Sequence, residues 1–380
     1  MRNPIRIAAR CGEQGSLVIL PERRIVAGSP PPCPPTARAR RPRSLCAVIL
    51  LACAGTAAAF NPAAGDYSRQ QPTDIRVMSY NTLKNIVVTT ELLPVYQRIL
   101  TAVDPDVILF QEVNPDVTVT QINAYLNATL PFTTSAGAPG SWSSQIGLTD
   151  GFNRNAVASK FPMSLRRQDT IPASEVRGVV MALLDLPDST YRHDFYAMCV
   201  HLKASGTAAD EARRIKAADA IAAWIRDIQT PGGNINLAQG TPLVYGGDTN
   251  LRTSSTVAND ALLAGNISDE ATYGADHPPD WDGTASTDAT PRDPFRTNSS
   301  TINTHSSAST SPVSRLDRLY ITDSAATIGA SFVFNTLSMT TTARAALGVQ
   351  TNDTRDASDH LPIAVDFRIG LAERSEWVLF

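Results

Sequence analysis

Cysteine and lysine are scarce over most of this 380-residue chain, and each scarcity excludes a class of protein. Four of the five cysteines fall within residues 1–59, which leaves only Cys199 beyond them. A single cysteine excludes an internal disulfide and a cysteine zinc site from residues 60–380. Those residues hold four lysines among 24 basic side chains, against 34 acidic ones, for a net charge of −10. That balance excludes a strongly basic nucleic-acid-binding coat, although the twenty arginines leave room for a local patch.

An apolar run long enough to span a membrane is also lacking near the N-terminus. The apolar segment at about residues 45–54 has roughly half of the ~20 residues that cross a bilayer. It follows a basic run at residues 38–43 and precedes small residues that end at Ala59, which is the order of a secretory signal peptide. We therefore expect residues 37–59 to be a signal peptide cleaved near Ala59. The mature protein would then be secreted or periplasmic, without a transmembrane segment; a retained membrane anchor is the alternative.

Residues 1–36 are rich in arginine and proline and show no apolar periodicity. A bacterial-style signal peptide rarely carries so long an extension before its basic region. We interpret these residues as sequence translated from upstream of the true start, or as a disordered extension. No methionine lies between Met1 and Met78, so a start nearer the signal would need a non-AUG codon.

The rest of the chain alternates short apolar segments with a few helical ones. Buried strands are expected where β-branched and apolar residues run between turn residues, at 75–83, 106–113, 155–163, 178–186, 194–202, 242–250, 315–321, 331–334 and 361–367. Apolar positions at helical spacing predict helices at 91–103 and 208–228. Residues 272–312 are rich in Asp, Pro, Ser and Thr and predict a long surface excursion. This pattern favours one α/β sandwich domain over residues 70–370.

Polar side chains stand at or near the ends of six predicted strands. They are Asn81, Glu112, His201, Asp248 with Asn250, Asp317, and Asp359 with His360. Strand ends that meet at one edge can bring such groups together in a pocket. Taken singly, each has a simpler explanation, since Asn or Asp after a strand usually forms a turn and a histidine can be a hydrogen-bonded core residue. The joint pattern is hard to reach by chance and indicates a site.

The order of these segments resembles the endonuclease/exonuclease/phosphatase superfamily, which has the deoxyribonuclease I-like fold. The segments that carry the resemblance are SYNTL, PDVILFQEV, NRNAVASKFP, VHLK, GGDTN, RLDRLYI and ASDHLP, spread over about residues 75–368. Thr249 departs from the pattern, because the family more usually has an aromatic or apolar residue there, but its side chain is not expected to touch the metal. The resemblance implies a four-layered α/β sandwich, with two packed, mostly antiparallel sheets flanked by helices and the site at one end.

The resemblance also implies hydrolysis of a phosphoester bond assisted by a divalent metal. Asn81 and Glu112 would be metal ligands, and Asp359 a further ligand or a partner of one. Oxygen ligands of this kind suit Mg²⁺, with Mn²⁺ or Ca²⁺ as the other candidates. A metal there would neutralise the charge that builds on the phosphate in the transition state.

Five further residues would carry the proton transfers. Asp248 would take a proton from the attacking water or orient it, and Asn250 would hold that geometry. His360 is the other candidate base, and Asp317 would fix its tautomer. His201 would donate to the phosphate as in an oxyanion hole. The sequence leaves open whether Asp248 or His360 activates the water.

The substrate is less sharply indicated than the chemistry. Asn155 and Arg177 are candidate phosphate contacts, although Arg177 could equally be a surface arginine. The superfamily includes nucleases, inositol-phosphate phosphatases and sphingomyelinases, and a shared fold does not choose among them. The charge of −10 argues mildly against tight duplex binding, and aromatics at 6% suggest no membrane-inserting hairpin. We expect a secreted nuclease or general phosphodiesterase whose partner is a phosphodiester substrate, nucleic acid first, with no stable protein partner.

Three alternatives stay open at this point. The first is a phospholipid-acting phosphodiesterase of the sphingomyelinase kind, and the second is a small-molecule phosphatase. The third is a secreted binding protein that kept the fold and lost catalysis, which the competent residues at every metal and acid/base position oppose.

Overall fold

The computed structural model describes residues 60–170, 178–309 and 311–372. The expected extension at 1–36, the expected signal peptide at 37–59 and the candidate substrate contact Arg177 lie outside these residues. Within the described part of the chain, no helix has both the length and the hydrophobicity that crossing a membrane requires.

Two six-stranded sheets form the centre of the described domain. The first sheet has the strand order β11-β12-β1-β2-β4-β3 and consists of β1 (Ile75–Asn81), β2 (Val107–Val113), β3 (Ser143–Ile146), β4 (Arg154–Ser159), β11 (Ala326–Val333) and β12 (Ile363–Ile369). The second sheet has the order β5-β6-β7-β8-β10-β9 and consists of β5 (Met163–Thr170), β6 (Gly178–Leu184), β7 (Phe195–His201), β8 (Leu243–Asp248), β9 (Thr287–Asp288) and β10 (Asp317–Ile321). Among the described strand pairs, β1–β2 and β7–β8 are parallel and the others antiparallel.

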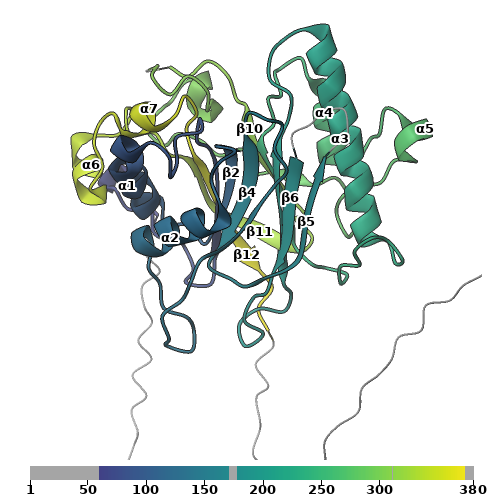
Figure 1. The fold of residues 1–380 in the computed structure, drawn as a ribbon, viewed down its shortest axis with the longest axis horizontal. Coiled ribbons are helices and arrows are strands. Elements are labelled where there is room, and N and C mark those ends of the chain that lie inside the picture. The colour runs from purple at the N-terminus through teal and green to yellow at the C-terminus, as the bar shows by residue number, and fades with distance from the viewer. Residues whose placement is uncertain (1–59, 171–177, 310, 373–380) are drawn as a thin grey trace, which may run out of the picture. The chain divides into compact units, whose positions relative to one another are not determined.

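Helices cover the outer side of each sheet, so the domain has four layers (Figure 1). Beside the first sheet lie α1 (Leu93–Val103), α2 (Val119–Thr129), α6 (Thr341–Leu347) and α7 (Asp353–Ala357). Beside the second lie α3 (Ala208–Gln229), α4 (Thr256–Ala264) and α5 (Glu270–Tyr273). Three short 3₁₀ turns complete the elements: η1 (Pro62–Ala64), η2 (Thr90–Leu92) and η3 (Ser299–Ile302). The expected four-layered α/β sandwich with mostly antiparallel sheets is confirmed.

The central strands β1 and β2 are buried along nearly their whole length, and because both of their faces are covered, most of their residues are apolar. In β1, Val77 packs in the core between the two sheets, whereas Met78 and Tyr80 pack in the core between the first sheet and its helices. Successive side chains of a strand point to opposite faces, so each strand supplies two cores at once. The near-continuous apolar runs of the sequence reflect this arrangement.

The two expected helices are confirmed with small changes in their bounds. The helix expected at 208–228 is α3, which begins with a capping box between Thr207 and Asp210 and buries Ala218 and Ile221 against the second sheet. The helix expected at 91–103 is α1, preceded by η2. It ends at Asp104, whose left-handed φ of 46° stops the helix.

Two expectations about the elements need correction. The single strand expected at 155–163 is two strands, because β4 ends in the first sheet and β5 starts in the second after a turn at residues 160–162. The segment 272–312 is less peripheral than a surface excursion. Its β9 pairs with β10, its Asp293 is 2% exposed, and its Trp281 packs against the core beside α3.

Candidate active site

The ends of strands from both sheets bring most of the predicted site residues together. His201 and Asp248 are direct partners in the parallel β7–β8 register, and Asp248 and Asp317 are partners in the antiparallel β8–β10 register. In the first sheet, Asn81 pairs with the residue before Glu112. The register aligns these groups within each sheet, and the Asn81–Asp248 hydrogen bond joins the two sets.

Asp248 lies at the centre of this group. Its Oδ2 accepts a hydrogen bond from Asn81 Nδ2 at 2.9 Å and lies 3.3 Å from His201 Nε2 and 3.6 Å from His360 Nε2. Burial alone would raise the pKa of this carboxyl, but the imidazoles of His360 and His201 and the Asn81 amide hold the pKa well below its ordinary value. Asp248 is therefore a buried carboxylate that stays ionised.

His360 is held by a second carboxylate. Its Nδ1–H donates to Asp317 Oδ2 at 2.8 Å, which fixes the ring and its tautomer. Burial lowers the pKa of His360, but the carboxylates of Asp317 and Asp248 outweigh it and raise the pKa to about 10. The segment before the ring is tied to β1, because Ser358 Oγ donates to the Asn81 carbonyl at 2.7 Å. Asp317, His360 and Asp248 thus form one connected unit.

Glu112 is the accessible carboxylate of the site, with a side chain that is 19% exposed. It sits where the pairing of β2 with β4 shifts register, and its φ is +52°. A positive φ in a non-glycine residue is uncommon and often marks a functional position. Its Oε1 accepts from Asn81 Nδ2 at 3.2 Å and lies 3.9 Å from His201 Nε2.

The residues present fit a hard divalent cation. The ligand atoms of Glu112, His201 and Asp248 lie within 4.8 Å of one another, Asn81 Nδ2 donates to both carboxylates, and Asn81 Oδ1 accepts from the Leu83 N–H at 3.0 Å. Carboxylate and amide oxygens are the ligands that Mg²⁺, Mn²⁺ and Ca²⁺ accept most readily. The partly exposed Glu112 gives such an ion a way in from solvent.

Asp359 belongs to a second group of possible metal ligands. Its side chain is half exposed and its Oδ2 is 3.9 Å from Nε2 of His305. Together with His360 these two residues form a second group whose ligand atoms lie within 4.8 Å. The His305 ring packs edge-on against His360, with 5.1 Å between the ring centroids.

His305 is the residue of this site that the sequence analysis missed. It belongs to the segment 272–312, which shows no strand or helix periodicity. Its backbone forms bridges with both Ser314 and His360, and these bridges bring the ring to the site. One signal was available, because the chain has only five histidines and this is one of them.

The remaining predicted residues support the site or lie outside the described part. Asn250, with a φ of +50°, donates from its N–H to Asp248 Oδ1 at 3.1 Å and from Nδ2 to the Leu202 carbonyl. Asn155 is buried, and its Nδ2 donates to the Gly178 carbonyl of the other sheet at 2.6 Å. The hydroxyl of Thr249 donates to the Leu316 carbonyl at 2.8 Å. Arg177 cannot be placed among these contacts.

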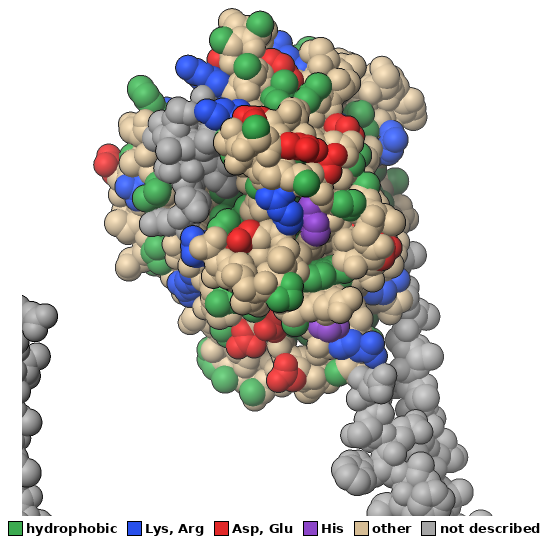
Figure 2. Space-filling view, turned by 90° about the vertical axis from the view of Figure 1, so that its right-hand side faces the viewer, with side chains coloured by type: hydrophobic (Ala, Val, Ile, Leu, Met, Phe, Trp, Pro, Cys, Tyr) green, Lys and Arg blue, Asp and Glu red, His purple; other side chains and the backbone are tan. Residues whose placement is uncertain are grey.

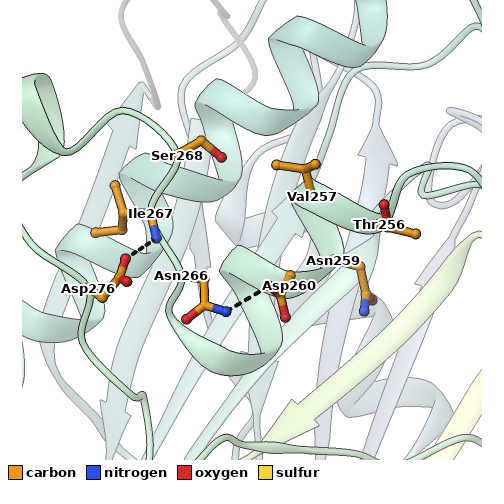
Figure 3. Close-up of a pocket in the computed structure, with 8 residues that line it drawn as sticks. All are labelled: Thr256, Val257, Asn259, Asp260, Asn266, Ile267, Ser268 and Asp276. Carbon is orange, nitrogen blue, oxygen red and sulfur yellow. Dashed lines mark hydrogen bonds between the residues drawn. The ribbon is translucent and has the colours of Figure 1, made fainter.

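A separate depression of about 480 Å³ lies between α4 and the segment after it (Figure 3). It is lined by Thr256, Val257, Asn259, Asp260, Asn266, Ile267, Ser268 and Asp276. Its polar groups largely bond to one another: Asn266 Nδ2 donates to Asp260, and the Ile267 N–H donates to Asp276. None of the predicted site residues lines it.

Comparisons with known proteins agree with this architecture. The model of the Endonuclease/Exonuclease/phosphatase family matches residues 78–360. An endonuclease/exonuclease/phosphatase family protein from Bacteroides thetaiotaomicron is 16% identical with a TM-score of 0.50, and the match covers 80% of this chain and 98% of that one. An endonuclease/exonuclease/phosphatase from Beutenbergia cavernae is 18% identical with a TM-score of 0.48, over 80% and 72% of the two chains.

A third solved structure, the catalytic domain of human Nocturnin with a bound sulfate anion, is 16% identical with a TM-score of 0.47, over 78% and 94% of the chains. Of these three matches, only the one with a TM-score of 0.50 supports a shared fold, and at 16% identity it shows nothing beyond the fold. A comparison of the sequence with curated proteins found no match.

Proposed function

The chain belongs to the endonuclease/exonuclease/phosphatase family, and we propose that it is a divalent-metal-dependent phosphodiesterase whose substrate is nucleic acid. Members of this family are hydrolases that act on phosphoester bonds. The observation that carries the proposal is the surrounding of Asp248, a buried carboxylate with two imidazoles within 3.6 Å and the accessible Glu112 beside it. That arrangement combines a proton acceptor, ligands for a cation and hydrogen-bond donors to the phosphate, which are the groups that phosphoester hydrolysis requires.

Glu112, with Asn81 and Asp248 beside it, would hold the cation. A bound divalent ion would supply positive charge to the phosphate oxygens. His201 and His360 are the hydrogen-bond donors placed to contact the same phosphate, and they would offset the charge that develops on it. Asp248 would orient the attacking water or accept its proton, since it is the ionised carboxylate at the centre of the site.

Geometry favours Asp248 over His360 as the group that receives this proton. The two ring nitrogens of His360 each face a carboxylate, Asp317 at 2.8 Å and Asp248 at 3.6 Å. An imidazole between two acceptors is placed to donate at both nitrogens. Under this proposal Asp317 orients the ring, and Nε2, which is too far from Asp248 for a hydrogen bond, donates to the phosphate.

Nucleic acid is preferred to lipid because the described surface exposes a single large aromatic side chain, whereas membrane-binding surfaces usually carry several. Nine large hydrophobic side chains of the described residues are exposed, eight of them Leu or Val and one of them aromatic. The face of the molecule in Figure 2 mixes acidic and basic side chains, with hydrophobic ones scattered among them. We also propose that the protein acts outside the cytoplasm, secreted or periplasmic, on the strength of the basic, apolar and small-residue order at 37–59.

The test of this function is Glu112→Gln in a nicking assay on supercoiled DNA, with Mg²⁺ and with EDTA. The change removes a charged ligand while keeping the shape of the side chain, so we expect cleavage to fall by about 10²-fold or more. Asp356→Asn is the matched control, because Asp356 is an exposed carboxylate paired with the adjacent Arg355. It should cut DNA like the wild type.

Two results would contradict the proposal. Undiminished cleavage by Glu112→Gln, with an unchanged circular dichroism spectrum, would show that the charge of Glu112 is not needed for the reaction. A wild-type protein that spares DNA and RNA but hydrolyses sphingomyelin vesicles would replace the nuclease with a phospholipid phosphodiesterase.

A further inference from the structure

An exposed aromatic ring with a lysine beside it stands next to the proposed site. Phe152 is 71% exposed, and it is the one aromatic among the exposed large hydrophobics of the described residues. The Nζ of Lys84 lies 5.9 Å from the centroid of its ring, within the reach of a cation–π contact. Lysine is rare here, since Lys84 is one of only four after residue 59.

The strand order places both residues at the edge that carries Glu112. Lys84 follows β1, and its N–H donates to the Glu112 carbonyl at 2.8 Å. Phe152 precedes β4, whose first residue Arg154 pairs with Val113, the neighbour of Glu112. Because β2 lies between β1 and β4, the two loops approach the end of β2 from opposite sides.

The ring is held outward by an ordered turn. Asp150 Oδ1 accepts hydrogen bonds from the N–H groups of both Phe152 and Asn153 at 2.8 Å, and Asn153 is itself buried. Gly151 supplies the positive φ of +88° that this turn uses. On the other side, Lys84 has a φ of +63°, which a lysine rarely adopts. Two constrained loops thus place an exposed aromatic ring beside the ammonium group of a partly buried lysine.

We infer that Lys84 and Phe152 form a subsite for an unpaired nucleotide next to the cleaved bond, an inference that rests on the proposed function. The nucleobase stacks on Phe152, and the Lys84 ammonium contacts a phosphate of the same strand. A nucleotide offers these two features together, whereas a lipid surface would call for a broader apolar patch. A base inside a duplex has both faces covered by its neighbours, so this subsite favours single strands, flaps and frayed ends over duplex.

The test compares three substrates with Mg²⁺: a short single strand, the same strand in duplex, and a strand of equal length built from tetrahydrofuran abasic units. Phe152→Ala should raise KM for the base-bearing single strand by about 5- to 150-fold, the range expected from losing one stacked base. Its kcat should change little, and the abasic strand should respond little because it has no base to stack. Phe152→Trp keeps an aromatic ring and should have the KM of the wild type. Val257→Ala, which changes an exposed apolar residue on α4, is the control and should also leave KM unchanged.

Lys84→Ala has a separate readout. For single strands the slope of log K against log salt is about −0.7 for each phosphate contact. The variant should bind the base-bearing and abasic strands more weakly and lower the steepness of this slope by about 0.7. Lys216→Ala, which removes an exposed lysine from α3, should leave the slope unchanged.

The outcomes separate this subsite from the proposed function. Equal effects of Phe152→Ala on the base-bearing and abasic strands would overturn stacking. Unchanged strand cleavage together with weaker hydrolysis of sphingomyelin vesicles would make Phe152 a membrane contact and overturn the subsite as well. If the wild type cuts no nucleic acid at all, the proposed function fails, and the subsite fails with it.

Discussion

His360 is buried between two carboxylates, and this position decides its charge. Its ordinary pKa is 6.5, and burial among apolar groups would lower it. Asp317 and Asp248 act in the opposite direction and raise the pKa to about 10 in the folded protein. Since the unfolded chain offers no such partners, folding and protonation of His360 favour each other near neutral pH.

The free energy of unfolding should therefore depend on pH, and we expect this dependence in protein kept free of metal ions by EDTA. The contribution of His360 is fully present below about pH 6.5 and is lost as the pH rises toward 10, because the unfolded chain gives up the proton first. The free energy of unfolding from urea titrations should therefore fall between about pH 6 and pH 9, and the fall should be smaller in His360→Gln. Equal slopes in the two proteins would show that His360 does not carry the charge.

Most of the site residues were predictable because each ends an apolar run. Asn81, Glu112 and Asp248 stand at the end of a buried strand, and strand ends that share an edge converge. His305 could not be found in this way. It reaches His360 through backbone bridges in an irregular segment, and no period in the sequence encodes such a contact.

The pairing of β1 with β12 contains a buried ion pair. Arg76 and Asp366 are direct partners in this register, and their side chains are 2% and 0% exposed. The guanidinium donates through Nε and Nη2 to both carboxylate oxygens, at 2.6 and 2.8 Å, and through Nη1 to the Val103 carbonyl at the end of α1. One side chain therefore connects two strands and a helix.

Removing one partner of this pair should be costly. Asp366→Ala leaves a buried guanidinium without its counter-charge, and we expect a loss of about 3–5 kcal/mol in the free energy of unfolding. Asp356→Ala also breaks an ion pair, but that pair is solvent-exposed, so it should cost no more than about 1 kcal/mol. Urea unfolding of both variants checks this contrast. Similar losses in the two variants would mean that burial does not determine how much an ion pair contributes to the free energy of unfolding.

The elements that the sequence analysis misjudged share a physical cause. In 155–163 the apolar pattern continues past the end of β4, because Phe161 and Met163 also pack against the core between the sheets, so local hydrophobicity cannot show a change of sheet. In 272–312 the polar composition hides buried roles. Asp293 accepts hydrogen bonds from Asn335 and Arg296, and Asp288 pairs with Arg315 and Arg318. Tertiary partners far along the chain decide both cases.

The two sheets pack face to face, and one cysteine marks the interface between them. Cys199 on β7 is fully buried, and its thiol donates to the Phe110 carbonyl of β2 at 3.2 Å. Gln111, also on β2, donates to the sulfur at 3.2 Å. These contacts join the second sheet to the first, next to the strand ends that carry Glu112 and His201. The packing that holds the sheets together also sets the spacing of the site.

Labelling of Cys199 should therefore report separation of the sheets. Burial raises the pKa of this thiol to about 12, so little thiolate exists at neutral pH, and no reagent reaches it while the sheets are packed. With iodoacetamide, and with mass analysis of the peptide that holds Cys199, labelling should be slower than in unfolded protein by about 10³-fold or more. If the sheets part only in global unfolding, the labelling rate should rise with urea as steeply as the unfolding equilibrium does. Fast labelling at a rate independent of urea concentration would instead mean that β7 opens locally. The site residues of the first sheet and those of the second would then move independently.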